Sequence, residues 1–337
     1  MRTRLHGFWA KRFCALLVPL LGISTGFSAS QAQTFPTRQV TITVPYTAGG
    51  PTDVIGRILG DHLSRTLGQP FIIDNAAGAG GTIAADKVAK SSPDGHTLLL
   101  HHLALVAAPS LYSNLRYDTR SAFAPIGLVN IGPLVIVARK SIPATTAKEL
   151  FAWIKVNGEK VTVGHAGAGS NSHLCEVLLA QALGVKLTYV AYRGAAPALN
   201  DLISGQIDLI CDQTTNSVPQ ILAGTIKAFA LTTPERNAAI PDVPTVVEVG
   251  IPEVMFSVWH GLYAPKGTPE AVITRLNTAL AAAVDDPSVQ AKFAAVGTVV
   301  YPNAQRSVAA HADLFAKDYA RITRLIESAG IKQSEAK

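Results

Sequence analysis

The chain has 337 residues, of which 48% are hydrophobic and 15% charged, with 29 lysines and arginines against 23 aspartates and glutamates. This length suits about two domains, and the hydrophobic content excludes an intrinsically disordered chain. The first 32 residues hold four of the basic side chains and none of the acidic ones. The remainder is therefore nearly neutral, without a lysine or arginine cluster that would indicate nucleic-acid binding.

These first 32 residues predict a secretory signal. A basic leader, MRTRLHGFWAKR, precedes the apolar run FCALLVPLLGI, and SASQA supplies small residues for cleavage after Ala32. The apolar run contains Pro19 and is shorter than the roughly 18 residues of a membrane span. We therefore expect export to the periplasm, where Cys175 and Cys211 either form a disulfide or remain small buried residues.

Strand-like and helix-like stretches alternate along the rest of the chain. The predicted strands are 39–46, 70–75, 96–102, 133–140, the start of 160–184, 186–192, 206–212 and 226–233. The predicted helices are 51–68, 81–92, 145–157 with a threonine cap, the remainder of 160–184, 194–205, 269–286, 287–297 and 306–330. This order favours parallel sheets with helices on their faces, arranged as two α/β lobes.

Two strand–glycine-turn–helix units are present, one at VPYTAGGPTD (44–53) and one at GAGSNSH (167–173). A helix N-terminus presents free N–H groups and a positive partial charge, so each turn suits an anion. The first turn lacks the lysine of a P-loop. Asp53 there would repel a multiply charged phosphate, but it could cap the helix or accept a hydrogen bond from a ligand. A small carboxylate fits better than a nucleotide, and a capped turn without a ligand is the alternative.

Polar side chains accompany the second turn. Ser170, Asn171 and Ser172 can cap the helix or bond a ligand oxygen, and Arg193 is either a carboxylate-binding cation or a surface residue. Ser170 and His173 are close in sequence, but GAGSNSH is not the G-x-S-x-G pattern of a serine hydrolase. Histidine and cysteine spacings do not match a metal site. We therefore predict no metal, no cofactor and no enzymatic activity.

Several motifs resemble those of the Bug, or TctC-type, extracytoplasmic solute-binding proteins of tripartite tricarboxylate transporters. In chain order these are VPYTAGGPTD, GAGGTIAADKVAKSSPDGHTLLL, PSLYSNLRYD, VAYRGAAPALNDLISGQID, IPDVPT and GLYAPKGTP. The resemblance implies a type II periplasmic-binding-protein fold, with two α/β lobes joined by a hinge and a ligand cleft between them. We expect lobe 1 at 33–135 and 252–337, lobe 2 at 136–251, and a monomer.

The resemblance also implies a set of ligand contacts. The loop from Tyr46 to Asp53 would hold a carboxylate through backbone groups and waters, and the second lobe would contribute the loop 167–173 and residues beyond it. The expected contacts are Tyr46, Thr47, Ala48, Gly49, Gly50, Thr52, Asp53, His102, Leu103, His165, Gly169, Ser170, Asn171, His173, Tyr192, Arg193, Asp212 and Gln213.

The chain departs from the family's usual residues in three places. The run 101–105, HHLAL, replaces a small polar run, His165 replaces a serine, and Arg193 replaces a lysine. Ring-bearing and apolar walls favour a flat aromatic acid such as terephthalate, or a related dicarboxylate, over a hydroxyl-rich citrate. The expected function is capture of this acid by lobe closure and delivery to membrane transporter subunits. The alternatives are a ligand-binding sensor for a membrane receptor and an exported α/β hydrolase.

Overall fold

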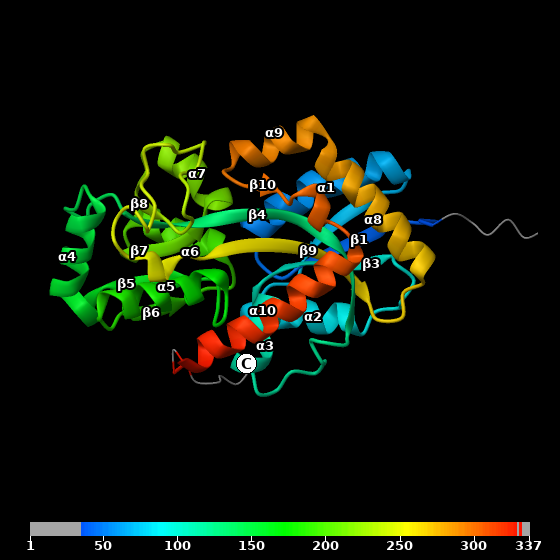
Figure 1. The fold of residues 1–337 in the computed structure, drawn as a ribbon, viewed down its shortest axis with the longest axis horizontal. Helices are drawn as coiled ribbons and strands as arrows, with labels where there is room; N and C mark the ends of the chain where they lie inside the picture. Colours follow the sequence, from blue (N-terminus) through cyan, green and yellow to red (C-terminus); the bar gives the residue numbers. More distant parts are fainter. Residues whose placement is uncertain (1–34, 329, 332–337) are drawn as a thin grey trace, which may run out of the picture. The chain divides into compact units, whose positions relative to one another are not determined.

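The computed structural model describes residues 35–328, 330 and 331, so the predicted signal lies outside the described residues. From Phe35 on, the chain forms one compact unit of strands and helices (Figure 1). The strands are β1 Val40–Val44, β2 Phe71–Asn75, β3 Thr97–His102, β4 Phe123–Arg139, β5 Thr162–His165, β6 Thr188–Ala191, β7 Leu209–Gln213, β8 Ile226–Leu231, β9 Ser257–Pro265 and β10 Val299–Val300. The helices are α1 Pro51–Leu67, α2 Thr82–Ala89, α3 Ala104–Leu111, α4 Ala147–Asn157, α5 Asn171–Leu183, α6 Ala195–Ser204, α7 Thr214–Leu222, α8 Glu270–Asp285, α9 Pro287–Ala295 and α10 Val308–Ser328.

The strands form one sheet that contains two parallel groups. The strand order is β2-β1-β3-β9-β4-β7-β5-β6, and β8 and β10 both pair with β4. β1 is parallel to β2 and β3, whereas β5 is parallel to β6 and β7. β4 and β9 are antiparallel to their neighbours and run between the two groups (Figure 1). Each group therefore has its own carboxyl edge, where the predicted glycine turns lie.

The long strand β4 differs from its predicted range, 133–140. It begins ten residues earlier, at Phe123, and pairs with β9 as far as Pro133 and with β7 from Leu134. Proline and glycine interrupt the apolar pattern of its first half, and register shifts in the β9 pairing accommodate them. The change of partner lies next to the predicted lobe boundary at 135–136, which remains a prediction.

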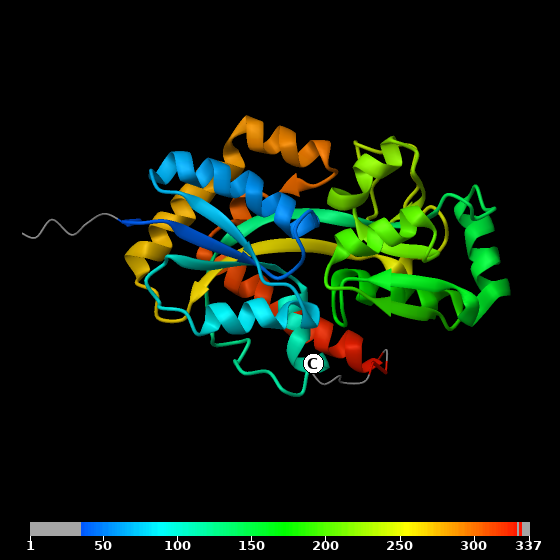
Figure 2. The ribbon, with the colours of Figure 1, turned by 180° about the vertical axis from the view of Figure 1, so that it is seen from behind.

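Helix packing follows the predicted apolar faces in most places. α1 begins with Pro51 and buries Ile55, Leu59 and Leu63, as its periodicity predicts. Thr146 caps α4 and forms a capping box with Glu149, which confirms the predicted threonine cap. Figure 2 shows α1 and α8 on the side of β1–β3, and α5 and α6 on the side of β5–β7.

Four elements, α3, α7, β9 and β10, were not predicted. Two of them, α3 and β9, were missed because both are apolar on all sides. Six of the eight residues of α3 are buried, which removes the 3.6-residue alternation that indicates a surface helix. β9 is buried along nearly its whole length, so it has no alternation of period two.

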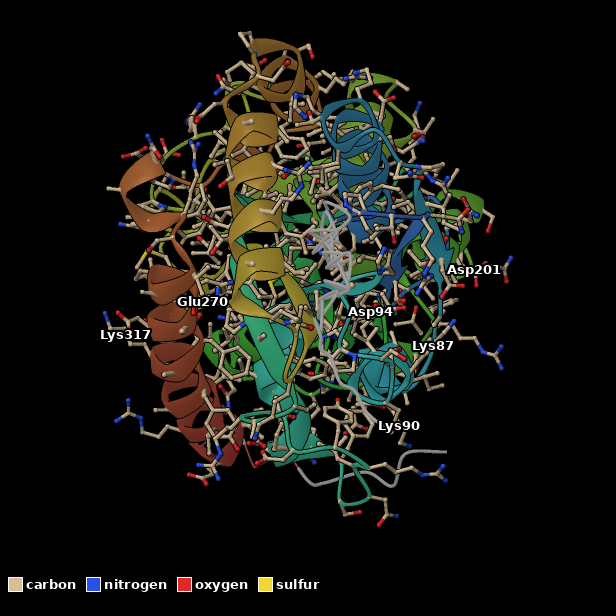
Figure 3. All side chains as sticks on the ribbon, turned by 90° about the vertical axis from the view of Figure 1, so that its right-hand side faces the viewer. Lys87, Lys90, Asp94, Asp201, Glu270 and Lys317 are labelled. Carbon is tan, nitrogen blue, oxygen red and sulfur yellow. A yellow bond between two sulfur atoms is a disulfide. The ribbon has the colours of Figure 1, made fainter. Side chains whose placement is uncertain are left out.

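Exposed charges lie on the outside of the unit. Figure 3 shows Lys87, Lys90 and Lys317 pointing away from the ribbon, and Lys87 pairs with Asp74 on the same surface at 2.7 Å. Among the described helices, we find none with both the length and the hydropathy needed to cross a membrane.

Candidate functional site

The turn between β1 and α1 is shaped by Asp53. Its carboxylate accepts hydrogen bonds from the backbone N–H of Gly49 at 2.9 Å, from Asn75 Nδ2 at 3.1 Å and from Arg57 Nε at 2.8 Å. Burial by itself would raise the pKa of Asp53, but these bonds, led by that from Arg57, lower it below the ordinary value. Asp53 therefore stabilises the turn through these hydrogen bonds. The positive charge of Arg57 offsets the negative charge of the Asp53 carboxylate.

His102, at the end of β3, lies behind this turn. The ring of Tyr46 stacks on it with centroids 5.0 Å apart, and Tyr46 Oη donates to the carbonyl of Gly80 at 3.1 Å. His102 Nδ1 accepts a hydrogen bond from the N–H of Ala104 at 3.1 Å. Burial holds the pKa of His102 well below its usual range. The neutral ring therefore carries its proton on Nε2, which makes that atom a donor.

Thr52 links the first turn of α1 to a second buried histidine. Its Oγ1 lies 3.2 Å from Nε2 of His260 on β9, in hydrogen-bond contact. His260 faces His102 in the β3–β9 pairing, and burial lowers the pKa of His260 to about 3. The side chains of His102 and His260, which lie next to the turn, are thus neutral imidazoles rather than cations.

The second turn leads into α5. Ser170 caps this helix, because its Oγ accepts from the N–H of His173 at 3.3 Å. Asn171 is the first residue of α5 and is only 2% exposed, yet neither atom of its amide group has a hydrogen-bond partner among the described residues. An unpaired buried polar group costs roughly 1–3 kcal/mol, so Asn171 is a strong candidate for a ligand contact.

The arrangement of Ser170 and His173 is not that of a nucleophile and its base. His173 Nδ1 accepts from the N–H of Gly169 at 3.2 Å, and its ring packs against that of His165 with centroids 4.7 Å apart. The hydroxyl of Ser170 meets the backbone of His173 and the hydroxyl of Ser172 instead. A serine nucleophile requires a hydrogen bond to the side chain of its base, which this pair lacks.

Asp212 and Gln213 end β7 and lead into α7. Asp212 Oδ2 accepts from Asn216 Nδ2 at 2.7 Å and from Ser217 Oγ at 2.6 Å. Burial raises the pKa of Asp212 to about 6, although both hydrogen bonds act in the opposite direction.

One cavity joins these elements. It is lined by Tyr46, Pro51, Thr52, His102, Leu134, Ala166, Ser170, Asn171, Ser172, Ala195, Asp212 and Gln213. Its volume is only about 20 Å³, far below the roughly 300–1,000 Å³ of ligand sites, so the lining residues must move apart to admit a ligand. The N-termini of α1, α5, α6 and α7 reach it, and no lysine or arginine of the described residues is part of its lining. Because each N-terminus carries about half a positive charge, the cavity is suited to an anion.

The structure brings many of the predicted contacts together. The ones that line the cavity are Tyr46, Thr52, His102, Ser170, Asn171, Asp212 and Gln213. The predicted turn residues Thr47, Ala48, Gly49 and Gly50 precede the lining residue Pro51 but are not themselves part of the lining. Asp53 is not part of it either, because its carboxylate is turned into the first turn.

The remaining predicted contacts lie away from the cavity. Leu103 is fully buried in the hydrophobic core. Tyr192 directs its hydroxyl to Asp201 Oδ2 at 2.6 Å, and Arg193 is exposed beyond the end of β6. The rings of His165 and His173 pack against each other and against Tyr189. Gly169 does not line the cavity, although its N–H holds His173 in place.

Three lining residues lie outside the predicted contacts and loops, namely Leu134, Ala166 and Ala195, whereas Pro51 and Ser172 belong to the predicted loops 46–53 and 167–173. Ala195 is the first residue of α6, so the rule that helix N-termini hold the anion could have indicated it. Leu134 reaches the cavity through the pairing of β4 with β7. That pairing is not local in the sequence, so no motif indicates it.

Turns of the two predicted lobes touch around the cavity. Tyr112 Oη donates to the carbonyl of Ala168 at 2.8 Å. Gly167 has φ +104°, and a Cβ there would lie 3.0 Å from the backbone nitrogen of Gly80. Only a glycine combines this backbone conformation with this approach. The turns are therefore in contact, as in a closed conformation.

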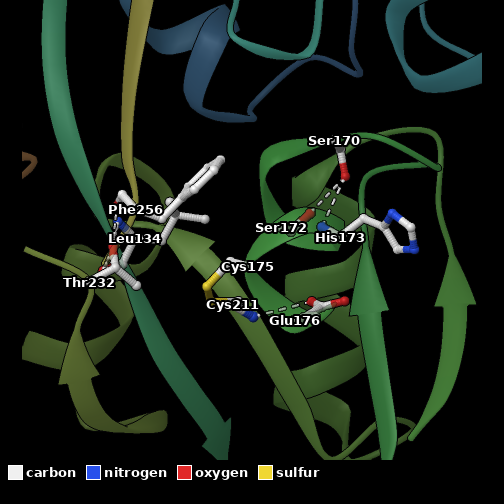
Figure 4. Close-up of a disulfide and its surroundings, with 9 residues drawn as sticks. All are labelled: Leu134, Ser170, Ser172, His173, Cys175, Glu176, Cys211, Thr232 and Phe256. Carbon is white, nitrogen blue, oxygen red and sulfur yellow. Dashed lines mark hydrogen bonds between the residues drawn. A yellow bond between two sulfur atoms is a disulfide. The ribbon is translucent and has the colours of Figure 1, made fainter. Parts of the chain in front are cut away.

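A disulfide joins Cys175 of α5 to Cys211 of β7 (Figure 4), which settles the choice left open by the sequence. Next to it, Glu176 Oε1 accepts from the N–H of Cys211 at 3.2 Å. Burial raises the pKa of Glu176 well above its usual value. The start of α5 and the end of β7, which both reach the cavity, are therefore held together covalently. In the described part of the chain, His, Cys, Asp and Glu side chains do not gather into a group that could hold a metal ion.

Comparison with known proteins identifies relatives over almost the whole chain. Residues 55–331 match the model of the tripartite tricarboxylate transporter family receptor. The UPF0065 protein in the TAR-I ttuE-ttuC' intergenic region of Agrobacterium vitis is 42% identical over 319 residues, 95% of this chain and 92% of that protein. The structure of the periplasmic binding protein BugD is 40% identical, with a TM-score of 0.86 over 89% of this chain and 100% of that one. MatC from Rhodopseudomonas palustris, solved with bound malate, is 38% identical, with a TM-score of 0.83 over 87% of this chain and 100% of that one. The shared fold confirms the predicted fold class.

Proposed function

Because the chain belongs to the family of tripartite tricarboxylate transporter receptors, we propose that it captures a small organic di- or tricarboxylate in the cavity between its two predicted lobes and delivers it to the membrane subunits of such a transporter. Closure then follows from tighter binding of the acid to the closed state than to the open one.

The observation that carries this proposal is the convergence of four helix N-termini on one cavity without a lysine or arginine in its lining. At about half a charge each, the four dipoles offset roughly two negative charges, which is the charge of a dicarboxylate. The unpaired amide group of Asn171 and the Nε2–H of His102 add directional donors. The malate bound to the similar MatC has this charge.

The lining of the cavity bears on the expectation of an aromatic acid. That expectation rested on the run 101–105, on His165 and on Arg193. Of these residues only His102 lines the cavity, whereas Leu103 and Leu105 are fully buried in the core. The lining therefore adds little support for an aromatic ligand, and the choice between an aromatic and an aliphatic acid stays a prediction.

Calorimetric titration with a panel of organic acids tests the proposal, with Asn171→Ala as the variant and Asn200→Ala, an exposed residue of α6, as the matched control. We expect micromolar or tighter binding of at least one acid and a loss of about tenfold in Asn171→Ala, the equivalent of one hydrogen bond to a charged group. Asn200→Ala should bind like the parent. Absence of binding to every acid in the panel would contradict the proposal, as would conversion of a bound acid to product.

We propose that the protein works in the periplasm, a location supported by its similarity to the periplasmic binding protein BugD and by the disulfide, which suits an oxidising compartment. We propose that it works there as a monomer without enzymatic activity. A sensor that docks a membrane receptor would use the same cavity. Growth of a deletion strain on the bound acid, with and without the permease subunits, distinguishes transport from sensing.

A further inference from the structure

Asp212 is the one acidic side chain that lines the cavity within the described part of the chain. It is 1% exposed and lies where four helix N-termini draw in a negatively charged ligand. A carboxylate at that position opposes an anion, because two like charges at close range disfavour each other. An ionised carboxylate at this position therefore favours a hydrogen-bond donor on the ligand over a second anion.

The hydrogen bonds of Asp212 leave it able to accept one more. Asn216 Nδ2 and Ser217 Oγ both donate to Oδ2, and the backbone N–H of Gln213 also bonds to the carboxylate. An ionised carboxylate has about four lone-pair sites, so at least one remains for a donor in the cavity. These three donors also hold the carboxylate in one orientation.

Asn171 adds a second acceptor on the same wall. Its carbonyl oxygen and its amide nitrogen are both unpaired among the described residues. A bare dicarboxylate presents acceptors only, so it would satisfy the helix N-termini but would offer no donor to the remaining acceptor site of Asp212 or to the Asn171 oxygen. Such unpaired buried groups weaken binding.

The placement of this wall is fixed by covalent structure. Cys211 directly precedes Asp212, and its disulfide to Cys175 joins the end of β7 to the first turns of α5, where Asn171 lies (Figure 4). Glu176 adds a hydrogen bond between the same two elements. The disulfide and this hydrogen bond therefore restrict movement between the elements that carry Asp212 and Asn171.

We propose, on the basis of the carboxylate-binding function above, that Asp212 is the specificity-determining residue of this cavity: it accepts a hydrogen bond from a hydroxyl or ammonium group of the ligand. The ligand is then a hydroxy- or amino-substituted carboxylate, and unsubstituted acids of the same length bind less well. The preference is opposite to the sequence-based expectation that hydroxyl-rich acids are disfavoured.

Matched ligand pairs test this on the unmodified protein. Calorimetry compares succinate with malate and aspartate, glutarate with 2-hydroxyglutarate and glutamate, and tricarballylate with citrate. In the pair that fits the cavity, we expect the donor-bearing acid to bind about tenfold or more tightly, in line with one hydrogen bond to a charged group. 2-Methoxysuccinate, which keeps the oxygen but has no proton to donate, should bind no better than succinate.

The variant Asp212→Asn adds a result that damage to the fold cannot produce. It removes the negative charge, so succinate should bind several-fold more tightly than to the parent, while the advantage of aspartate should be lost. Asp242→Asn, which removes the same charge from an exposed site, should leave all affinities unchanged.

The outcomes separate the two proposals. Equal affinities for the members of every pair, or an equal loss for substituted and unsubstituted acids in Asp212→Asn, would overturn the role of Asp212 while leaving carboxylate binding intact. Absence of binding to any acid would overturn both. The ratio between aspartate and malate shows whether the donor is an ammonium or a hydroxyl group.

Discussion

The hydrogen bond from Tyr112 to Ala168 offers a test of closure that does not touch the ligand. Tyr112 ends α3 in the first predicted lobe, and Ala168 belongs to the second. Tyr112 does not line the cavity. Replacing it by phenylalanine removes one neutral hydrogen bond of 2.8 Å and leaves the ring in place.

The expected size of the effect follows from the value of that bond. A neutral hydrogen bond contributes about 0.5–1.5 kcal/mol, and 1.4 kcal/mol corresponds to a factor of ten. Tyr112→Phe should therefore raise the Kd for the acid by about two- to tenfold. Because the bond joins the two predicted lobes, we expect it to form on closure, so the increase should appear mainly in the dissociation rate.

Stopped-flow fluorescence and calorimetry measure the rate and the affinity. Tyr189→Phe is the matched control, because its hydroxyl makes no hydrogen bond to the described residues and its ring lies outside the cavity. An affinity of Tyr112→Phe equal to that of the control would refute the reasoning, since the bond would then be formed equally in the open protein or contribute nothing to closure.

Two further predictions concern stability. Replacement of Cys175 and Cys211 by alanine opens a loop with a sequence separation of 36. The free energy of unfolding should fall by about 4 kcal/mol by the chain-entropy relation. Urea unfolding measures this loss, and an unchanged midpoint would contradict the prediction. Burial raises the pKa of Glu176 well above 4.5, so the folded state keeps a proton that the unfolded chain releases, and stability falls as the pH rises above about 4.5. Glu176→Gln should therefore stabilise the protein at pH 7, on the order of 1–3 kcal/mol, and have little effect at pH 4; equal effects at both pH values would show that the group is ionised in the fold.

Local signals accounted for the first turn and its helix. Pro51 at the first helical position, the apolar face of α1 and the threonine cap of α4 all depend on residues within a few positions of one another. Such features depend only on short segments of the sequence, so the sequence was sufficient to predict them. The two glycine turns were predicted for the same reason, and their binding of an anion remains a prediction.

The differences between the predicted contacts and the residues that line the cavity have a common physical origin in contacts between distant segments. Leu134 lines the cavity because β4 changes partner from β9 to β7 there, and Leu103 is lost to the core because α3 is covered on all sides. Arg193 has the right chemistry for a carboxylate, but it is exposed and is not part of the lining of the cavity. Residue type indicates what a side chain can bind, whereas only the packing of the sheet decides which way it points.

The absence of a basic side chain from the lining has a consequence for how this protein can change. The positive potential of the cavity belongs to backbone N–H groups at four helix N-termini, and a substitution cannot delete a backbone amide unless it introduces proline. The attraction of the cavity for a negatively charged ligand is thus largely insensitive to point mutation. The preference among such ligands depends on few side chains, foremost Asp212 and Asn171. One or two substitutions at these residues can therefore change which acid is accepted. The general capacity of the cavity to bind an anion is retained.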